Sequence, residues 1–184
     1  MSNAFPKHNL ETAPEKSKPL LRQLLEQSGP NGFYSVTAES PETLTAYAML
    51  HKAFMASSFT NEEKTVIWQT INVENQCHFC VPAHTYMAKA MKIDKAVSDA
   101  LRNETALPTA RLEALRDFTL LMLRNHGNAS DAEISKFLNA GYTHQNMLEI
   151  VLGLAQKTIS NYVNHLARTP VDKQYEKYAW NKVG

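Results

Sequence analysis

The sequence predicts an all-α fold of six to eight short and medium helices in a single domain with orthogonal or bundle-like packing. Apolar residues recur at three- and four-residue spacing through most of the chain, as on the buried face of a helix. Sustained strand-like alternation is absent, and 6 glycines are few for a β-rich chain of 184 residues. A chain of this length with 43% hydrophobic residues can bury a core of its own.

Signals at the helix ends divide the chain into elements. Thr60 with Glu63, and Ser130 with Glu133, have the spacing of a capping box, in which the two side chains satisfy each other's backbone amides. The segment 30–39 is expected to be an irregular connector. Helices are expected at about 19–28, 41–55, 61–74, 77–91, 94–103, 109–126, 131–140 and 144–169.

The chain has three parts by this interpretation. Residues 1–18 are polar and lack periodicity, which predicts a flexible N-terminal arm. Residues 19–170 form the helical domain. Residues 171–184 form a C-terminal tail that packs either on its own core or on a neighbouring subunit, because spaced aromatic side chains seek an apolar partner. The aromatic residues of the tail are Tyr175, Tyr178 and Trp180.

Composition excludes several classes of function. The 19 basic and 18 acidic residues leave a net charge of +1, so we expect neither nucleic-acid nor anionic-membrane binding. The longest apolar run, Ile150–Ala155, is far shorter than the roughly 20 residues of a membrane span. No apolar signal segment is visible, which predicts a cytoplasmic protein. No glycine-rich phosphate loop is present, so no nucleotide cofactor is expected.

The two cysteines stand close together, at Cys77 and Cys80, near the start of an expected helix. A disulfide between them would close too short a loop to add much stability. At a helix start, free backbone N–H groups and the helix dipole favour a thiolate. His84 lies one turn deeper on the same face and could take a proton from either thiol, whereas His78 is rotated away. This pattern predicts redox chemistry.

Other interpretations of these residues compete with redox chemistry. Structural zinc needs four ligands, and Cys77, Cys80 and His84 offer three. Attached haem needs a histidine directly after the second cysteine, where Val81 stands. Two inert buried thiols remain an alternative, since free cysteine is often buried.

The spacing of Glu74, Cys77, Cys80 and His84, within the segment 59–88, gives the pattern Glu-x-x-Cys-x-x-Cys-x-x-x-His. This pattern resembles the alkylhydroperoxidase AhpD and carboxymuconolactone decarboxylase superfamily, in its peroxidase-related branch. The resemblance implies an AhpD-like orthogonal helical bundle, a homo-oligomer, a hydroperoxide substrate and an external dithiol reductant such as a lipoyl-bearing adaptor.

The resemblance extends more weakly over 19–170, where the segment 161–165 (Asn-Tyr-Val-Asn-His) is its one further local feature. It implies that Cys80 attacks the peroxide, that Cys77 is the resolving partner, and that His84 belongs to a proton relay. The helix-start argument instead favours activation of Cys77, so the order of the two cysteines stays open.

The sequence also departs from the family pattern. The relay of the family carries a glutamate twelve residues before the first cysteine, and Thr65 stands there. Glu74 could substitute for it, or could be a solvated carboxylate at a helix end. The expected function is a thiol-dependent alkyl hydroperoxide reductase; a lactone decarboxylase and a non-enzymatic redox sensor are the alternatives. Four other histidines are expected to be structural: His51, His126, His144 and His165.

Overall fold

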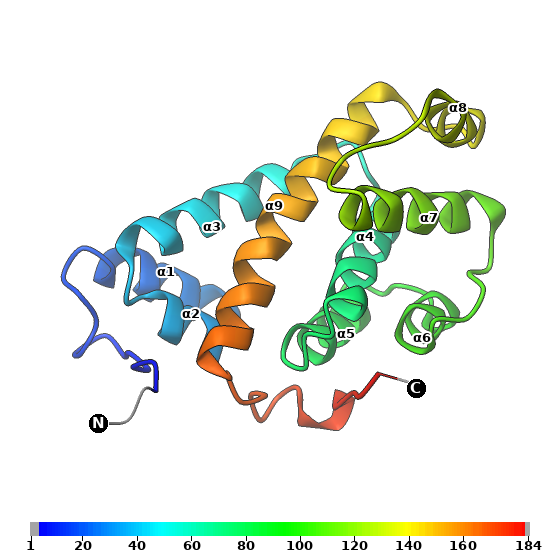
Figure 1. The fold of residues 1–184 in the computed structure, drawn as a ribbon. Helices are drawn as coiled ribbons and strands as arrows, with labels where there is room; N and C mark the ends of the chain where they lie inside the picture. Colours follow the sequence, from blue (N-terminus) through cyan, green and yellow to red (C-terminus); the bar gives the residue numbers. More distant parts are fainter. Residues whose placement is uncertain (1–3, 183–184) are drawn as a thin grey trace.

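The computed structural model describes residues 4–182, and these form nine α-helices and one short 3-10 helix, without a strand (Figure 1). The all-α prediction is confirmed. None of the helices in the described part of the chain is long and apolar enough to cross a membrane. The elements are α1 (Lys18–Ser28), α2 (Gly32–Thr37), α3 (Pro41–Met55), α4 (Asn61–Glu74), α5 (Cys80–Ala90), α6 (Lys95–Asn103), α7 (Ala110–Arg124), α8 (Asp131–Asn139), α9 (His144–Ala167) and η1 (Glu176–Tyr178).

Eight of these α-helices fall in segments expected to be helical, and the ninth, α2, lies in the expected connector 30–39. The connector prediction is therefore wrong. The side chain of Asn31 accepts a hydrogen bond from the Tyr34 amide and starts α2. Burial of Phe33 and Val36 holds the short helix in place.

Both predicted capping boxes are present at the starts of α4 and α8. The Glu63 amide donates to Thr60 Oγ1 at 3.2 Å, and the Thr60 amide donates to Glu63 Oε2 at 2.9 Å. Ser130 and Glu133 make the same reciprocal pair. Short-range hydrogen bonds of this kind fix a helix start without help from the rest of the fold.

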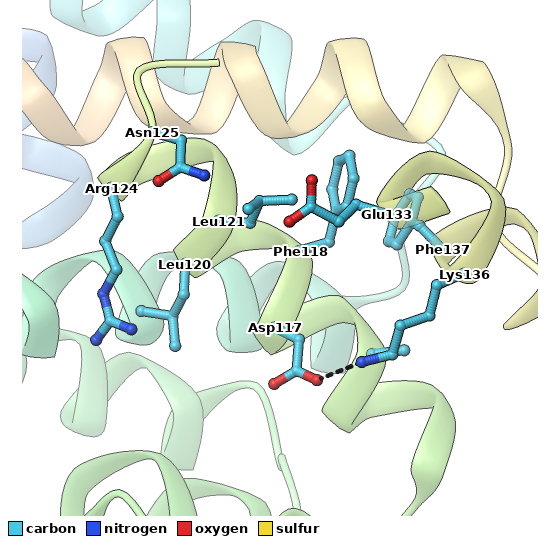
Figure 2. A pocket seen from close by; sticks show the side chains of 10 residues that line it. Asp117, Phe118, Leu120, Leu121, Arg124, Asn125, Glu133, Lys136 and Phe137 are labelled. Atoms are coloured by element: carbon cyan, nitrogen blue, oxygen red, sulfur yellow. Dashed lines mark hydrogen bonds and ion pairs between the residues drawn. The ribbon is translucent and has the colours of Figure 1, made fainter. Parts of the chain in front are cut away.

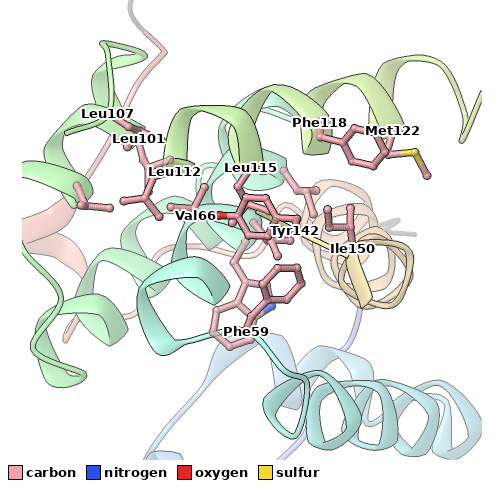
Figure 3. Packing of buried hydrophobic residues seen from close by; sticks show 14 of the residues in the cluster. Phe59, Val66, Leu101, Leu107, Leu112, Leu115, Phe118, Met122, Tyr142 and Ile150 are labelled. Carbon is pink, nitrogen blue, oxygen red and sulfur yellow. The ribbon is translucent and has the colours of Figure 1, made fainter. Parts of the chain in front are cut away.

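The helices pack around α4 and α9. Helix α9 crosses the molecule, with α3 packed along it and α4 in contact with both α9 and α7 (Figure 1). Nearly every residue of α4 is buried, and its side chains meet those of α6, α7 and α9 in the main core (Figure 3). A second, more aromatic cluster surrounds the two cysteines. The site therefore lies between the helices beside the main core.

Both terminal segments pack on the helices. Within the expected flexible arm 1–18, the described residues 4–18 contact the α2 region, where the buried Ser17 donates to Ala38 O at 2.7 Å. The tail runs along α5 and α6, and Trp180 Nε1 donates to Arg102 O at 2.8 Å. The described part of the tail thus contacts its own chain, and packing on a neighbouring subunit stays a prediction. Residues 1–3 and 183–184 of these two segments lie outside the described residues.

Candidate active site

A tight turn after α4 carries the first cysteine. Gln76 takes a left-handed conformation, with φ of 52°, which breaks the helix. The Cys77 amide then donates to Asn72 O at 2.9 Å, and α5 begins only at Cys80. The helix therefore starts three residues later than the expected start near Cys77. Of the two cysteines, only Cys80 lies in the first turn of α5, and Cys77 precedes the helix.

A chain of buried amides ties this turn to the neighbouring helices. Asn75 Nδ2 donates to Asn161 Oδ1 of α9 at 2.9 Å, and Asn161 Nδ2 donates to Asn72 Oδ1 of α4 at 2.9 Å. Asn72 Nδ2 in turn donates to Gln69 Oε1 at 3.0 Å. Gln69 Nε2 reaches the Val81 carbonyl of α5 at 3.1 Å. Since satisfied buried amides resist rearrangement, they hold the cysteine turn against α9.

The two sulfur atoms lie 2.6 Å apart, and both cysteines are free. A disulfide bond is about 2.05 Å long, so a small side-chain movement would bring the sulfurs to bonding distance. The Cys80 amide donates to Cys77 Sγ at 3.3 Å, and Asn164 Nδ2 of α9 donates to Cys80 Sγ at 3.4 Å.

The surroundings of the two thiols give them different pKa values. Burial would raise the pKa of Cys80, but the hydrogen bond from Cys77, the charge of Lys157 and the amides of Asn164 and Asn161 lower it to about 6. The pKa of Cys77 is raised well above its usual value, because it donates its hydrogen bond to Cys80 and is buried. Cys80 is therefore the thiolate near neutral pH, and Cys77 stays a thiol.

Cys80 opens onto a cavity of about 380 Å³ between α1, α2 and α3 on one side and α5 and α9 on the other. Cys77 is fully buried and does not line it. The described residues that line this cavity include no aspartate or glutamate. Its aromatic lining residues are Phe33, Tyr34, Tyr47, Phe79, Tyr86 and Tyr175, of which Tyr175 comes from the C-terminal tail.

Lys157 of α9 is buried in the wall of the same cavity, with 1% of its surface exposed. Its Nζ lies 2.8 Å from Nε2 of His84. An ammonium group has only donors, so the imidazole nitrogen accepts this hydrogen bond. Burial, followed by the charge of Lys157, lowers the pKa of His84 well below its usual value, and His84 is neutral. Burial also lowers the pKa of Lys157, against the opposing effect of the Cys80 thiolate charge.

A second, half-buried histidine lies close to this pair. His51 of α3 lines the cavity and stacks on Trp68 at 5.9 Å, and the Trp68 ring also packs against His84 at 5.0 Å. Gln156 Nε2 lies 3.0 Å from His51 Nδ1 and 3.3 Å from the Tyr47 hydroxyl. Burial, with the charge of Lys157, lowers the pKa of His51 to about 4.

The structure places Cys77 against Cys80, and Cys80 and His84 line the same cavity, but Glu74 lies elsewhere. Both carboxylate oxygens of Glu74 accept hydrogen bonds from Arg124 of α7, at 2.6 and 2.8 Å. These bonds lower the pKa of Glu74, and it does not line the cavity. Glu74 was predicted to join the site, but it forms an ion pair with Arg124 instead.

Thr65 and His78, two other positions considered in the sequence, lie outside the cavity lining. Thr65 is buried in α4, donates to Asn61 O at 2.9 Å and does not line the cavity. His78 faces away from the sulfurs as expected, with Nε2 2.9 Å from Thr169 O. In residues 4–182 no three His, Cys, Asp or Glu side chains are grouped so as to hold a metal ion.

Lys157 is a site residue that sequence reasoning missed, and Asn164, within the segment 161–165, was given no role there. They lie on a buried, largely polar stripe of α9. A lysine within such a stripe is a signal, because an unpaired buried charge is costly and lysine is seldom fully buried. The members of the stripe are Gly153, Gln156, Lys157, Ser160, Asn161 and Asn164.

Another hollow, of about 350 Å³, lies between α7 and α8 (Figure 2). Phe118 and Phe137 line it together with charged side chains, including the Asp117–Lys136 ion pair at 3.2 Å. None of the predicted site residues lines it.

The sequence matches no protein-family model and no curated protein. Solved structures do match. An alkylhydroperoxidase AhpD core protein of Ralstonia eutropha JMP134, an uncharacterized peroxidase-related protein, has a TM-score of 0.82 at 20% identity, covering 93% of each chain. A peroxidase-related protein from Silicibacter sp. TM1040 has a TM-score of 0.76 at 19% identity, covering 95% of this chain and 97% of that one.

The debrominase Bmp8, a cysteine-to-alanine variant in complex with 2,3,4-tribromopyrrole, has a TM-score of 0.73 at 16% identity, covering 96% of each chain. The chain has the AhpD-like fold. The expected AhpD-like bundle is confirmed, and the neighbours show that this fold hosts more than one activity. Within its AhpD-like fold, this chain places a buried lysine at a paired-cysteine cavity that no carboxylate lines among the described residues.

Proposed function

We propose that this protein is a thiol-dependent peroxidase that reduces alkyl hydroperoxides through Cys80 and Cys77. The observation that carries the proposal is the pair of sulfurs 2.6 Å apart, with Cys80 opening onto the cavity and its pKa lowered to about 6. A thiolate is the nucleophilic form of cysteine, and a partner thiol within reach can resolve the oxidised product. The peroxidase-related neighbours with the same fold give it further support.

The reaction has three steps. The Cys80 thiolate attacks the terminal peroxide oxygen, the O–O bond breaks, and Cys80 becomes a sulfenic acid while the alcohol leaves. Cys77 then attacks the Cys80 sulfur, which forms the disulfide and releases water. An external dithiol reduces the disulfide by exchange and is itself oxidised to a disulfide.

The arrangement favours Cys80 as the attacking residue and Cys77 as the resolving one. Cys80 occupies the first turn of α5, accepts hydrogen bonds and lines the cavity. The sequence predicted a helix start at Cys77, which would have favoured the Cys77 thiolate. Because α5 begins at Cys80, the free N–H groups and the dipole at the helix start favour the Cys80 thiolate instead. Cys77 is buried behind it. A dithiol such as a lipoyl group would reach the pair through the cavity, where the Cys80 sulfur is the accessible one.

The test is consumption of cumene hydroperoxide with dihydrolipoamide as the electron donor. Cys80→Ser should abolish it, and Cys77→Ser should lower turnover, because the Cys80 sulfenic acid must then be reduced directly by the external dithiol. His78→Gln, whose ring contacts Thr169 and not the cavity, is the matched control and should behave as the native chain. Undiminished turnover in both serine variants would refute the proposal. A disulfide that forms and is reduced without turnover would favour a redox sensor, and thiol-independent carboxymuconolactone decarboxylation would favour a decarboxylase.

Reductive debromination of an aromatic ring is the second candidate function. The six aromatic side chains around the cavity favour it, as does the tribromopyrrole complex of Bmp8 in the same fold. Bromide release from 2,3,4-tribromopyrrole, supplied with the same dithiol, would distinguish this activity from peroxide reduction. Both activities would require Cys80.

A further inference from the structure

The Lys157 ammonium and the Cys80 thiolate are the two opposite charges at the cavity. Lys157 is almost fully buried, and an unpaired buried ammonium is costly. No aspartate or glutamate is among the described residues that line the cavity, so no carboxylate there can balance the charge. The Cys80 thiolate is the anion that acts on Lys157 most strongly. The resting site is therefore a buried thiolate–ammonium pair.

His84 fixes the direction of the ammonium group. It accepts one N–H of Lys157 at 2.8 Å, and Trp68 packs on its ring. His84 is the hydrogen-bond partner of Nζ among the described residues, which leaves the other N–H groups for a molecule in the cavity. Since the neutral imidazole accepts the Lys157 hydrogen bond at Nε2, His84 is a positioning residue and not the acid.

We propose that Lys157 is the general acid that protonates the oxygen leaving when Cys80 attacks a hydroperoxide. This inference rests on the proposed peroxidase function. It gives the leaving oxygen a proton donor in a cavity that neither Thr65 nor Glu74 lines.

The step balances in atoms and charge. The Cys80 sulfur forms a bond to the terminal oxygen of ROOH, the O–O bond breaks, and the leaving RO⁻ takes a proton from Lys157 to give ROH. Sulfur is oxidised by two electrons and the peroxide is reduced by two. The products are the Cys80 sulfenic acid and a neutral Lys157 amine. When the external dithiol later reduces the Cys77–Cys80 disulfide, its two protons return to Cys77 and Lys157, and the thiolate–ammonium pair is restored.

The test compares two oxidants that differ in their need for an acid. Cumene hydroperoxide releases a strongly basic alkoxide, whereas peracetic acid releases a weakly basic carboxylate. The single-turnover rate of Cys80 oxidation is measured in a Cys77→Ser background by trapping the sulfenic acid with dimedone. Lys157→Met removes the ammonium and keeps the length of the side chain; Lys157→Arg keeps the charge but cannot release a proton near neutral pH. Each variant is assayed above the thiolate pKa measured for it by ultraviolet absorbance.

General acid catalysis contributes about 10²–10⁴-fold, so Lys157→Met should lower the cumene hydroperoxide rate by about 10² or more. Its peracetic acid rate should fall far less. Lys157→Arg should keep the Cys80 thiolate and show the same selective loss, which separates proton donation from charge stabilisation. If one of the two Lys157 variants does not fold, the ratio of the two oxidant rates in the other variant still tests the proposal.

Equal losses on both oxidants would overturn the assignment of Lys157 and leave the peroxidase proposal standing. A native Cys80 that reacts with cumene hydroperoxide no faster than a free thiol would overturn both.

Discussion

The side-chain nitrogen of Lys157 lies 2.8 Å from Nε2 of His84, and both residues line the cavity onto which Cys80 opens. This contact joins α9 to α5 at the reacting sulfur. Because His84 accepts the hydrogen bond, it stays neutral and the positive charge belongs to Lys157. The charge in turn favours the Cys80 thiolate.

The pH dependence of thiol reactivity should report this arrangement. The pKa of Cys80 is lowered to about 6, so its thiolate is present above that pH and is lost below it. Alkylation of Cys80 by iodoacetamide should therefore rise through about pH 6 and level off, while Cys77 reacts slowly throughout. Mass spectrometry of the labelled peptide measures both rates, with Cys80→Ser as the control. A midpoint near the ordinary thiol value of about 8.5 would contradict the proposed thiolate.

Asn164→Ala should raise the pKa of Cys80. Asn164 Nδ2 donates to the sulfur at 3.4 Å, and a hydrogen bond to a charged group contributes about 1.5–3 kcal/mol. Since one pKa unit corresponds to about 1.4 kcal/mol, we expect a rise of roughly one to two units. The exposed Tyr162→Phe on the same helix is the control and should leave the iodoacetamide profile unchanged. An unchanged midpoint in Asn164→Ala would mean that the amide does not stabilise the thiolate.

Stability should fall in mild acid because of His51. Its pKa is about 4 in the fold, below the usual 6.5, so the unfolded chain takes up a proton that the folded chain refuses. The unfolding free energy should decrease as the pH falls from about 6.5 to about 4, by about 3 kcal/mol for this residue. The lowered pKa of His84 acts in the same direction.

Urea unfolding at several pH values measures this slope. His51→Gln should flatten it, because glutamine does not titrate. The exposed Lys52→Gln, on the next residue of α3, also changes one side chain but leaves the half-buried His51 ring in place, and should keep the native slope. An identical slope in native and His51→Gln chains would contradict the prediction.

Features that depend on neighbours in the sequence were predictable. The capping boxes at Thr60 and Ser130 use residues three apart, and the spacing of Cys77, Cys80 and His84 is equally local. Helix α2 is six residues long and is stabilised from far away, because the Gly32 amide donates to Asp172 at 3.0 Å. No local pattern contains that contact.

The site was only partly predictable for the same reason. His84 and Lys157 are 73 residues apart in the chain. The apolar spacing of α9 correctly predicted a helix but did not identify its buried face, since Leu148 and Leu166 are 73% and 69% exposed. The polar stripe that includes Lys157 is buried instead, because it faces the cavity and the amides around the cysteine turn.

Gly153→Ala tests how closely α9 approaches its neighbours, one turn before Lys157. A Cβ at this position would lie 2.8 Å from Phe54 Cε2 of α3 and 3.1 Å from Ile67 Cγ2 of α4. Alanine is favoured over glycine within a helix by about 0.5–1 kcal/mol. Overpacking a tight core costs about 1–3 kcal/mol, and both neighbours are fully buried and cannot move aside freely.

The overpacking cost should exceed the gain in helix propensity, so the unfolding free energy of Gly153→Ala should fall by roughly 1–2 kcal/mol. Urea denaturation measures it against Thr158→Ala, an exposed position on the same helix that should stay within about 0.5 kcal/mol of the native chain. A Gly153→Ala chain as stable as the native one would mean that α3 and α4 lie further from α9. Because α9 carries Lys157 and Asn164, such a separation would also loosen the contacts that position both side chains at Cys80.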